Sequence, residues 1–238
     1  MKLDILAFAA HPDDTELGCA GTLALHISKG YKVGVIDLTR GELGTRGSAE
    51  IRDKEAEASA KLLGLAVRDN LKFADGFFSN DKSHQLAIIR AIRKYQPKMV
   101  LANAPSDRHP DHGKAAELVR DACFLSGLAK INVSDGDDAL PAWRPEVVYH
   151  YIQSNYLTPD FIVDVSDHWS TKEQAIKCFS SQFYDPKSKE PATFISSPDF
   201  LEFIVSRAKE LGHSIGAKYG EGFIKTKNIG VSNLFDLK

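Results

Sequence analysis

The sequence predicts an α/β fold: a Rossmann-like, mostly parallel sheet with helices on both faces, followed by a C-terminal elaboration. In the first half of the chain, short apolar runs alternate with amphipathic helical segments, which is typical of right-handed βαβ units. The composition is that of a globular protein, with 43% hydrophobic and 26% charged residues. A length of 238 residues suits one large domain. We therefore predict a single domain over residues 1–238.

The elements of the first half follow from the spacing of apolar residues. Runs of consecutive apolar residues predict strands, and apolar residues three and four positions apart predict helices. Gly30 and Gly64 each follow a helical segment and Pro97 follows a third, as is common at helix ends. The expected strands cover 3–9, 32–38, 70–73 and 98–102, and the expected helices cover 15–29, 48–63, 85–95 and 112–125.

The second half is less regular. Residues 130–145 are rich in Asp, Gly and Pro and are expected to form a loop. After this loop, apolar patterns predict strands over 146–152 and 161–165 and helices over 168–180 and 199–209.

Charge and cysteine content narrow the class of function. The net charge is −2, so the chain is not expected to bind nucleic acid or an anionic membrane. Its apolar runs are shorter than the roughly 18 residues of a membrane span. The apolar start contains Asp4 and leads directly into a polar string, so we interpret it as a buried strand and not as a signal peptide. Cys19, Cys123 and Cys178 are far apart, which argues against a disulfide framework and favours the reducing cytoplasm.

Two short strings carry most of the chemical information: residues 11–14 (His-Pro-Asp-Asp) and residues 109–112 (His-Pro-Asp-His). The first directly follows one expected strand, and the second lies in the loop after another. In a doubly wound sheet of order 3-2-1-4-5, strands one and four are neighbours, and their C-terminal ends open the ligand crevice. We therefore expect the two strings to meet. The first loop lacks the glycines of a dinucleotide site, so no redox cofactor is expected.

The three histidines and three aspartates of these strings suit a metal centre. His11 and Asp14 are three residues apart at the start of an expected helix, so both can bind one ion, and His109 or His112 can supply a third ligand. Zn²⁺ in such a site keeps a position open for water and lowers the pKa of this water to about 7. Fe²⁺ is an alternative, because two histidines and one carboxylate also bind iron in oxygenases.

The remaining groups suit acid–base chemistry. Asp13 could accept a proton from water, and the histidine that is not a ligand could stabilise an oxyanion, with its tautomer fixed by Asp111. This combination predicts a hydrolase of amides or esters. A simpler interpretation is that Asp14 or Thr15 only caps a helix, but two such strings at two strand ends favour a metal site.

These motifs resemble the signature of the LmbE-like, GlcNAc-PI de-N-acetylase family. The resemblance is carried by residues 10–18 and 108–112, and it extends through 39–47, 181–184 and 219–223. It implies a zinc-dependent hydrolase that removes acetyl from N-acetylglucosamine conjugates. The chain looks most similar to the bacillithiol-biosynthesis branch, which acts on N-acetylglucosaminyl malate.

The resemblance also implies a role for each residue and an assembly that is often hexameric. The implied metal ligands are His11, Asp14 and His112. The implied catalytic residues are Asp13 as general base and His109 as charge-stabilising acid, held by Asp111. The implied substrate contacts are Arg52 and Arg144. Residues 198–201 (Pro-Asp-Phe-Leu) depart from relatives that place a mobile tyrosine near the site.

We therefore expect a cytoplasmic, homo-oligomeric, zinc-dependent de-N-acetylase of a small-molecule amino-sugar conjugate. Three alternatives stay open at this point. The enzyme could be a broader deacetylase of chitooligosaccharides or other N-acetyl sugars. The same ligand set could serve a non-haem Fe(II) oxygenase. The chain could also be a binding module without activity, although a pure binder has no need of the extra carboxylate of Asp13.

Overall fold

The computed structural model describes residues 1–236 and contains one large sheet covered by helices. The strands of the sheet are β1 (Ile5–Ala9), β2 (Val33–Thr39), β3 (Val67–Phe73), β4 (Met99–Ala102), β7 (Val147–Tyr151), β8 (Phe161–Asp164) and β9 (Gly220–Lys225). The helices are α1 (Asp14–Ser28), α2 (Ala49–Leu63), α3 (Lys82–Tyr95), α4 (Pro110–Leu125), α5 (Trp169–Lys177) and α6 (Phe200–Ser214). Two 3₁₀ turns, η1 (Ser166–His168) and η2 (Leu234–Asp236), and a short hairpin of β5 (Ser134–Asp135) and β6 (Asp138–Ala139) complete these elements.

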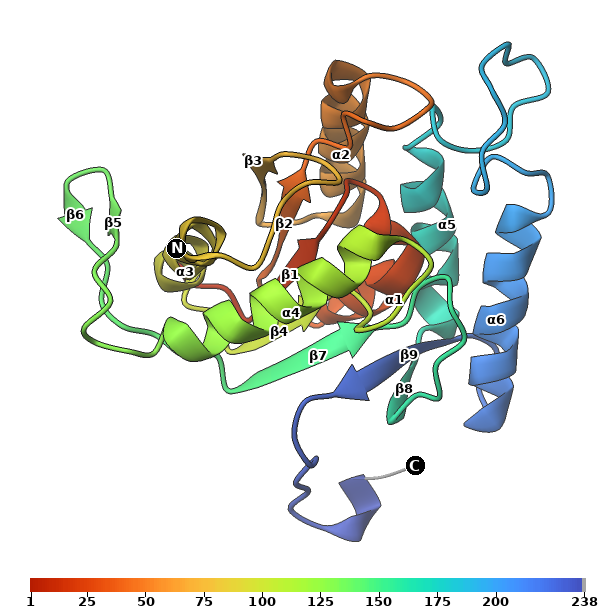
Figure 1. Cartoon of the computed structure of the whole chain (residues 1–238). Coiled ribbons are helices and arrows are strands. Elements are labelled where there is room, and N and C mark those ends of the chain that lie inside the picture. Colours follow the sequence, from red (N-terminus) through yellow and green to blue (C-terminus); the bar gives the residue numbers. More distant parts are fainter. Residues whose placement is uncertain (237–238) are drawn as a thin grey trace.

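The strand order confirms the predicted fold class. The seven strands are ordered β3-β2-β1-β4-β7-β9-β8 (Figure 1), and the first five in this order run parallel. β1 and β4 are hydrogen-bonded neighbours, with Ile5 opposite Met99. The C-terminal ends of these two strands therefore meet at one edge of the sheet. In doubly wound sheets, this is where ligands bind.

Both faces of the sheet are buried, because successive side chains of a strand point to opposite faces. Leu6 and Phe8 of β1 pack with the apolar residues of α3 and α4. Ile5 and Ala7 pack on the other face with apolar residues of α1, including Leu23. This two-sided burial explains why β1, β2 and β4 appear in the sequence as largely apolar runs. β3 lies at the edge of the sheet and is only partly buried, which fits its polar sequence.

The second half of the chain departs from the sequence prediction in two places. β9 was not predicted, yet it lies between β7 and β8 and pairs antiparallel with both. Its apolar pattern is interrupted by two glycines and by Glu221, which is only 3% exposed. The predicted loop over 130–145 contains the β5–β6 hairpin, which projects from the body of the molecule (Figure 1).

Glu221 is buried because it is fully paired. It accepts a hydrogen bond from Lys172 Nζ at 2.6 Å, and its two oxygens accept from the backbone amides of Gly21 and Thr22 at 2.9 and 2.7 Å. Lys172 also donates to the carbonyl of Leu17. The side chains of α5 and β9 thus attach directly to the backbone of α1.

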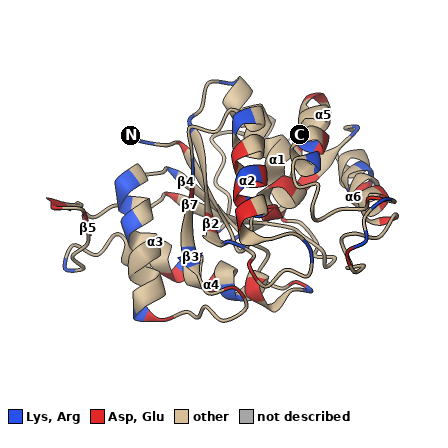
Figure 2. Cartoon of the chain, turned by 90° about the horizontal axis from the view of Figure 1, so that it is seen from above, with Lys and Arg blue, Asp and Glu red and all other residues tan. Residues whose placement is uncertain are grey.

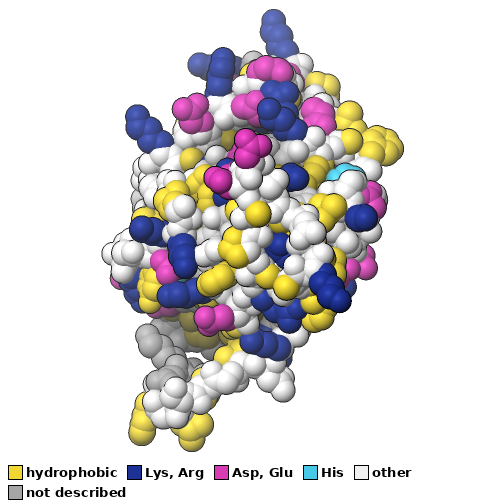
Figure 3. Space-filling view, turned by 90° about the vertical axis from the view of Figure 1, so that its left-hand side faces the viewer, with side chains coloured by type: hydrophobic (Ala, Val, Ile, Leu, Met, Phe, Trp, Pro, Cys, Tyr) yellow, Lys and Arg dark blue, Asp and Glu magenta, His cyan; other side chains and the backbone are white. Residues whose placement is uncertain are grey.

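Charges on the outside of the molecule are mixed in sign. Lys, Arg, Asp and Glu alternate along α2 (Figure 2), and both signs are interspersed with hydrophobic side chains on the face seen in Figure 3. Within residues 1–236, no helix has the length and apolar character needed to cross a membrane.

A buried charge network joins β2, β3 and α1. The Arg68 guanidinium donates to Asp37 at 2.9 and 3.1 Å and to Glu16 at 2.6 Å, and all three side chains are at most 6% exposed. Burial raises the pKa of the Asp37 carboxyl, and the charge of Arg68 opposes this rise. The network holds the start of α1 against the sheet.

We expect Arg68→Met to lower the free energy of unfolding by about 3–5 kcal/mol, because it leaves two buried carboxylates without their cation. Urea unfolding followed by circular dichroism measures this change. Arg120→Met is the matched control: Arg120 is 54% exposed and forms a surface ion pair with its neighbour Asp121, so its loss should be at most about 1 kcal/mol. Equal losses in the two variants would show that the network contributes no more than a surface pair.

Candidate metal centre

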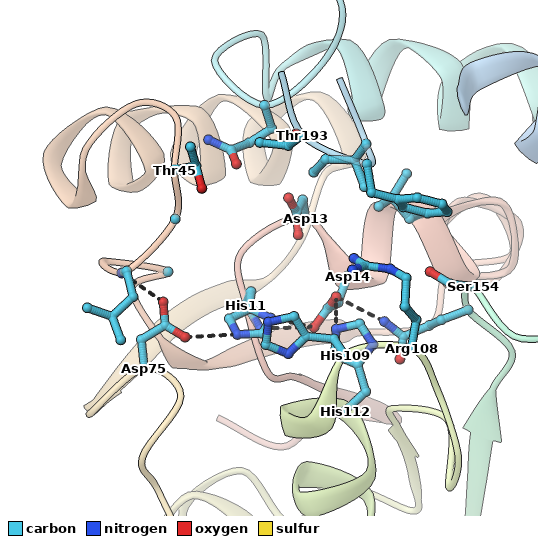
Figure 4. Close-up of a pocket in the computed structure, with 18 of the residues that line it drawn as sticks. His11, Asp13, Asp14, Thr45, Asp75, Arg108, His109, His112, Ser154 and Thr193 are labelled. Atoms are coloured by element: carbon cyan, nitrogen blue, oxygen red, sulfur yellow. Dashed lines mark hydrogen bonds and ion pairs between the residues drawn. The ribbon is translucent and has the colours of Figure 1, made fainter. Parts of the chain in front are cut away.

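The structure brings the two strings together at the C-terminal edge of β1 and β4. The ring centroids of His11 and His109 are 4.6 Å apart, and those of His109 and His112 are 5.2 Å apart. One nitrogen atom from each of the three rings lies within 4.8 Å of the others. Figure 4 shows these side chains on the floor of a cavity of about 480 Å³.

His11 and His112 each have one ring nitrogen toward Asp14 and the other on a second carboxylate. His11 Nδ1 lies 3.8 Å from Asp14 Oδ2, and its Nε2 lies 3.0 Å from Asp75 Oδ1. His112 Nε2 lies 3.1 Å from Asp14 Oδ1, and its Nδ1 lies 2.5 Å from Asp107 Oδ2. Metal-ligating histidines typically have a carboxylate or carbonyl on the nitrogen that does not bind the ion. Two imidazoles and one carboxylate in this arrangement fit a divalent metal such as Zn²⁺.

His109 is held differently. Its Nδ1 accepts a hydrogen bond from the backbone amide of Asp111 at 3.3 Å, where His109 caps the start of α4. Burial lowers the pKa of His109, and so do the positive charges of His11 and His112. A neutral imidazole that accepts at Nδ1 carries its proton on Nε2. His109 is therefore suited to donate a hydrogen bond through Nε2.

The first string does not serve as a helix cap. Asp13 occupies the N-cap position of α1, but its side chain caps no backbone amide and its φ is 122°. Few residues other than glycine adopt such a φ, and strained backbone of this kind clusters at functional sites. Asp14 accepts from the His11 amide at 2.9 Å and from the side-chain amides of Asn103 and Gln153. Both carboxylates are thus positioned for the cavity.

Arg52 holds Asp13 in place. Its guanidinium lies 2.8 Å from Asp13 Oδ2 and donates to the carbonyl of Pro12 and to Gln182 Oε1. Gly41, at φ 65°, permits this approach, because a Cβ atom there would lie 2.9 Å from Arg52 Cζ. Arg52 also lines the cavity, and its two terminal nitrogens contact Gln182, Pro12 and Asp13.

The carboxylates create a site that favours positive charge. Burial opposes protonation of both ligand histidines. Hydrogen bonds to Asp111 and Asp75 nevertheless raise the pKa of His11 to about 10, and Asp14 and Asp107 raise that of His112 to about 9. The same negative field favours a bound cation.

The two adjacent aspartates of the first string differ in their ionisation. Burial raises the pKa of Asp13 to about 7, although the positive charge of Arg52 opposes this rise. Burial has the same tendency at Asp14, but the neighbouring His112 and His11 outweigh it and hold the pKa of this carboxyl well below its usual range. Asp14 is thus suited to bind a cation, and Asp13 is suited to exchange a proton.

Two residues do not make the contacts expected of them. The Asp111 carboxylate does not hold His109: it accepts from the Gly76 amide at 2.8 Å and from Lys114, and it lies 3.5 Å from His11 Nε2. Asp111 sits in the first turn of α4, where these donors face it. Arg144 is not brought to the cavity of this chain. It donates to the carbonyl of Phe124 and stacks on that ring, near the C-terminal end of α4.

Sequence reasoning missed three residues that complete the site. Asp75 and Asp107 contact the ligand histidines, and Arg108 lines the cavity. Asp75 follows β3 by two residues, so it leaves the sheet at the same edge as the first string. A polar residue just after a parallel strand is the sequence signal by which Asp75 could have been predicted as a site residue.

Comparison with known proteins shows relatives in sequence and in fold. Residues 6–123 match the family model described as GlcNAc-PI de-N-acetylase. The chain is 31% identical over 189 residues to a diacetylchitobiose deacetylase of Thermococcus kodakarensis, covering 75% of this chain and 70% of the relative. It is 26% identical over 193 residues to a 4-oxalmesaconate hydratase of Pseudomonas putida, covering 74% and 73%. The crystal structure of the conserved protein TT1542 from Thermus thermophilus superimposes with a TM-score of 0.86, at 33% identity and 98% coverage of both chains.

Proposed function

The chain belongs to the GlcNAc-PI de-N-acetylase family, and on this premise we propose that it is a zinc-dependent hydrolase that removes the N-acetyl group from an amino-sugar conjugate. One observation carries the proposal. Asp13, a buried carboxylate that neither caps a helix nor belongs to the ligand set, lines the same cavity as His11, Asp14 and His112. A hydrolase needs such a base beside its metal ligands, whereas a binding module does not.

His11, Asp14 and His112 would hold the metal. When bound, Zn²⁺ would polarise the acetyl carbonyl and lower the pKa of a water molecule. Asp13, with a pKa of about 7, accepts a proton as the water oxygen bonds to the carbonyl carbon. His109 donates a hydrogen bond from Nε2 to the oxygen that becomes negative. Asp13 then returns its proton to the amine nitrogen as the C–N bond breaks, so the products are a free amine and acetic acid, which loses its proton to solvent to give acetate.

Arg108 supports an anionic conjugate as the substrate. Its side chain is exposed in the cavity, and its guanidinium lies 4.4 Å from the ring centroid of Phe194. Within residues 1–236, no carboxylate forms an ion pair with it. A cation in the cavity whose charge is not neutralised by a carboxylate of the described residues favours a substrate with carboxylates. We therefore infer N-acetylglucosaminyl malate as the substrate, in preference to neutral chitooligosaccharides.

Hydration of an unsaturated carboxylic acid is a second candidate. The hydratase of Pseudomonas putida matches three quarters of this chain. The general base Asp13 and the free cation Arg108 would also suit the addition of water to a double bond beside a carboxylate. The two reactions differ in product, because only deacetylation releases an amine.

A substrate panel tests the proposal. Zinc-loaded protein is incubated without oxygen with N-acetylglucosaminyl malate, N-acetylglucosamine and diacetylchitobiose, and release of free amine is measured. We expect amine release without oxygen, and the fastest release from the malate conjugate. An absolute requirement for Fe²⁺ and oxygen would instead indicate an oxygenase. Absence of amine release together with hydration of an unsaturated dicarboxylic acid would establish the second candidate.

The role of Arg108 is tested by Arg108→Met, which keeps an apolar contact with Phe194 and removes the charge. We expect KM for the malate conjugate to rise at least tenfold, because a charge-assisted hydrogen bond contributes about 1.5–3 kcal/mol. KM for diacetylchitobiose should change less than twofold. Equal rises for both substrates would show that Arg108 shapes the cavity without recognising a carboxylate.

Homo-oligomer formation and a cytoplasmic location are further parts of the proposal. They rest on the family resemblance and on the cysteine pattern. Sedimentation equilibrium tests the assembly: a hexamer is expected, and a monomer at micromolar concentration would contradict it.

A further inference from the structure

We propose that Asp75 and Asp107 are positioning residues that fix the two ligand histidines and connect each of them to a loop lining the cavity. This inference rests on the metal site of the proposed function. It concerns how the ligand nitrogens are selected and held, which neither the sequence motifs nor the family match specifies.

Asp75 joins His11 to the loop between β2 and α2. Asp75 Oδ1 lies 3.0 Å from His11 Nε2, and Oδ2 accepts a hydrogen bond from the Leu43 amide at 2.9 Å. The Asp75 amide in turn donates to Glu42 Oε1 at 3.0 Å. Asp75 is 6% exposed, and Leu43 and Gly44 line the cavity. Figure 4 shows the carboxylate of Asp75 between this loop and the His11 ring.

Asp107 makes the equivalent connection on the other side. Its Oδ2 lies 2.5 Å from His112 Nδ1, and its Oδ1 accepts from the Asn155 amide at 2.6 Å. The Asp107 side chain is fully buried. Ser154, the residue before Asn155, lines the cavity. Each ligand histidine is therefore paired with a carboxylate whose second oxygen binds a backbone amide at or beside the cavity wall.

These contacts select the ligand nitrogen. A neutral imidazole that donates from one nitrogen to a carboxylate leaves the lone pair of the other nitrogen free to bind a metal. Asp75 binds Nε2 of His11 and so leaves Nδ1 toward Asp14, whereas Asp107 binds Nδ1 of His112 and leaves Nε2 toward Asp14. The opposite nitrogens of the two rings thus converge on one carboxylate.

Asparagine cannot replace either carboxylate. A carboxylate accepts hydrogen bonds at both oxygens, but an amide accepts at one atom and donates at the other. Asp75→Asn must therefore lose the contact with His11 or the contact with the Leu43 amide. If the amide nitrogen faces His11 Nε2, it competes with the proton on this nitrogen and favours the tautomer with the proton on Nδ1, where a metal would bind. Asp111 Oδ2, 3.5 Å away, then remains beside Nε2 as a carboxylate acceptor.

Zinc affinity tests the proposal without substrate. Asp75→Asn and Asp107→Asn are titrated with Zn²⁺ in competition with a chromophoric chelator, and each should bind 10–100-fold more weakly, as is typical when such partners are lost. Asp137→Asn is the matched control, because Asp137 is exposed on the projecting hairpin. Affinities of both site variants within twofold of the control would overturn the proposal.

Amide hydrogen exchange of the unmodified protein tests the connection to the loops and does not depend on how a variant folds. Zn²⁺ should slow exchange of the Leu43 and Asn155 amides by at least tenfold, because their acceptors become fixed by the bound histidines. Exchange of the Gly136 amide, in the hairpin, should not change. Equal exchange of Leu43 and Asn155 with and without Zn²⁺ would contradict the connection. Zinc binding without amine release would refute the proposed function and leave this inference intact.

Discussion

Asp13→Asn is expected to lower kcat for acetyl release by about 10³-fold while one equivalent of zinc stays bound. A general base contributes typically 10²- to 10⁴-fold to the rate, and the amide cannot accept the proton of the attacking water. The ligand nitrogens and Asp14 are unchanged in this variant, so metal binding should persist. Arg52, 2.8 Å from the replaced carboxylate, should keep the side chain in the same place by donating to the amide oxygen.

Two measurements on the same sample check this result: amine release at saturating substrate, and metal content after dialysis. Asp137→Asn serves again as the control, with activity and zinc content expected to equal those of the unchanged protein. Near-normal turnover by Asp13→Asn would remove Asp13 from the reaction. Loss of zinc together with activity would mean that Asp13 helps to hold the metal.

His112→Ala should weaken zinc binding by about 10³-fold, whereas His109→Ala should leave it intact. Structural zinc sites bind with about 10–16 kcal/mol in total, so one of the few ligands contributes roughly 4 kcal/mol, and each 1.4 kcal/mol is tenfold in affinity. Within residues 1–236, no carboxylate forms a hydrogen bond or ion pair with the His109 ring, and we assign this residue to the oxyanion. Its removal should therefore lower turnover and leave the zinc affinity unchanged.

Chelator competition and amine release on both variants separate the two roles. The comparison is informative because the rings are stacked only 5.2 Å apart, and His109 shares with His11 and His112 a spacing that suits a metal. If His112→Ala retained a full equivalent of zinc and His109→Ala lost it, the third ligand would be His109. The carboxylate on His112 Nδ1 would then need another explanation.

The parallel core could be predicted because its sequence signals are local. β1, β2 and β4 are short, largely apolar runs, and Gly64 ends α2 in the left-handed conformation that favours glycine. β3, at the edge of the sheet, contains four polar residues, and only its C-terminal part was predicted. β9 could not be predicted in the same way, since its inward position at Glu221 is polar. That residue is stabilised by Lys172 and by amides of α1 about 200 positions earlier in the chain, which no local pattern reveals.

The site was predictable to the extent that it depends on strand ends. The C-terminal ends of neighbouring parallel strands lie side by side, and from this we correctly predicted that residues 11–14 and 109–112 meet. The partners of each carboxylate depend on loops whose conformation the sequence pattern does not specify. Asp111 therefore contacts His11 instead of holding His109, and the connection from Asp75 through Leu43 to the cavity wall was not foreseen. Arg144 was assigned by resemblance alone, and in this chain it packs on Phe124.

The attachment of Glu221 and Lys172 to α1 has a consequence for biosynthesis. A protein is synthesised from its N-terminus to its C-terminus. The helix that follows the first histidine string therefore leaves the ribosome long before residue 221 is made. Until then the amides of Gly21 and Thr22 lack the carboxylate that binds them in the finished protein. The helix that starts at the first histidine string therefore gains these contacts only after residue 221 has been synthesised, about 200 residues later.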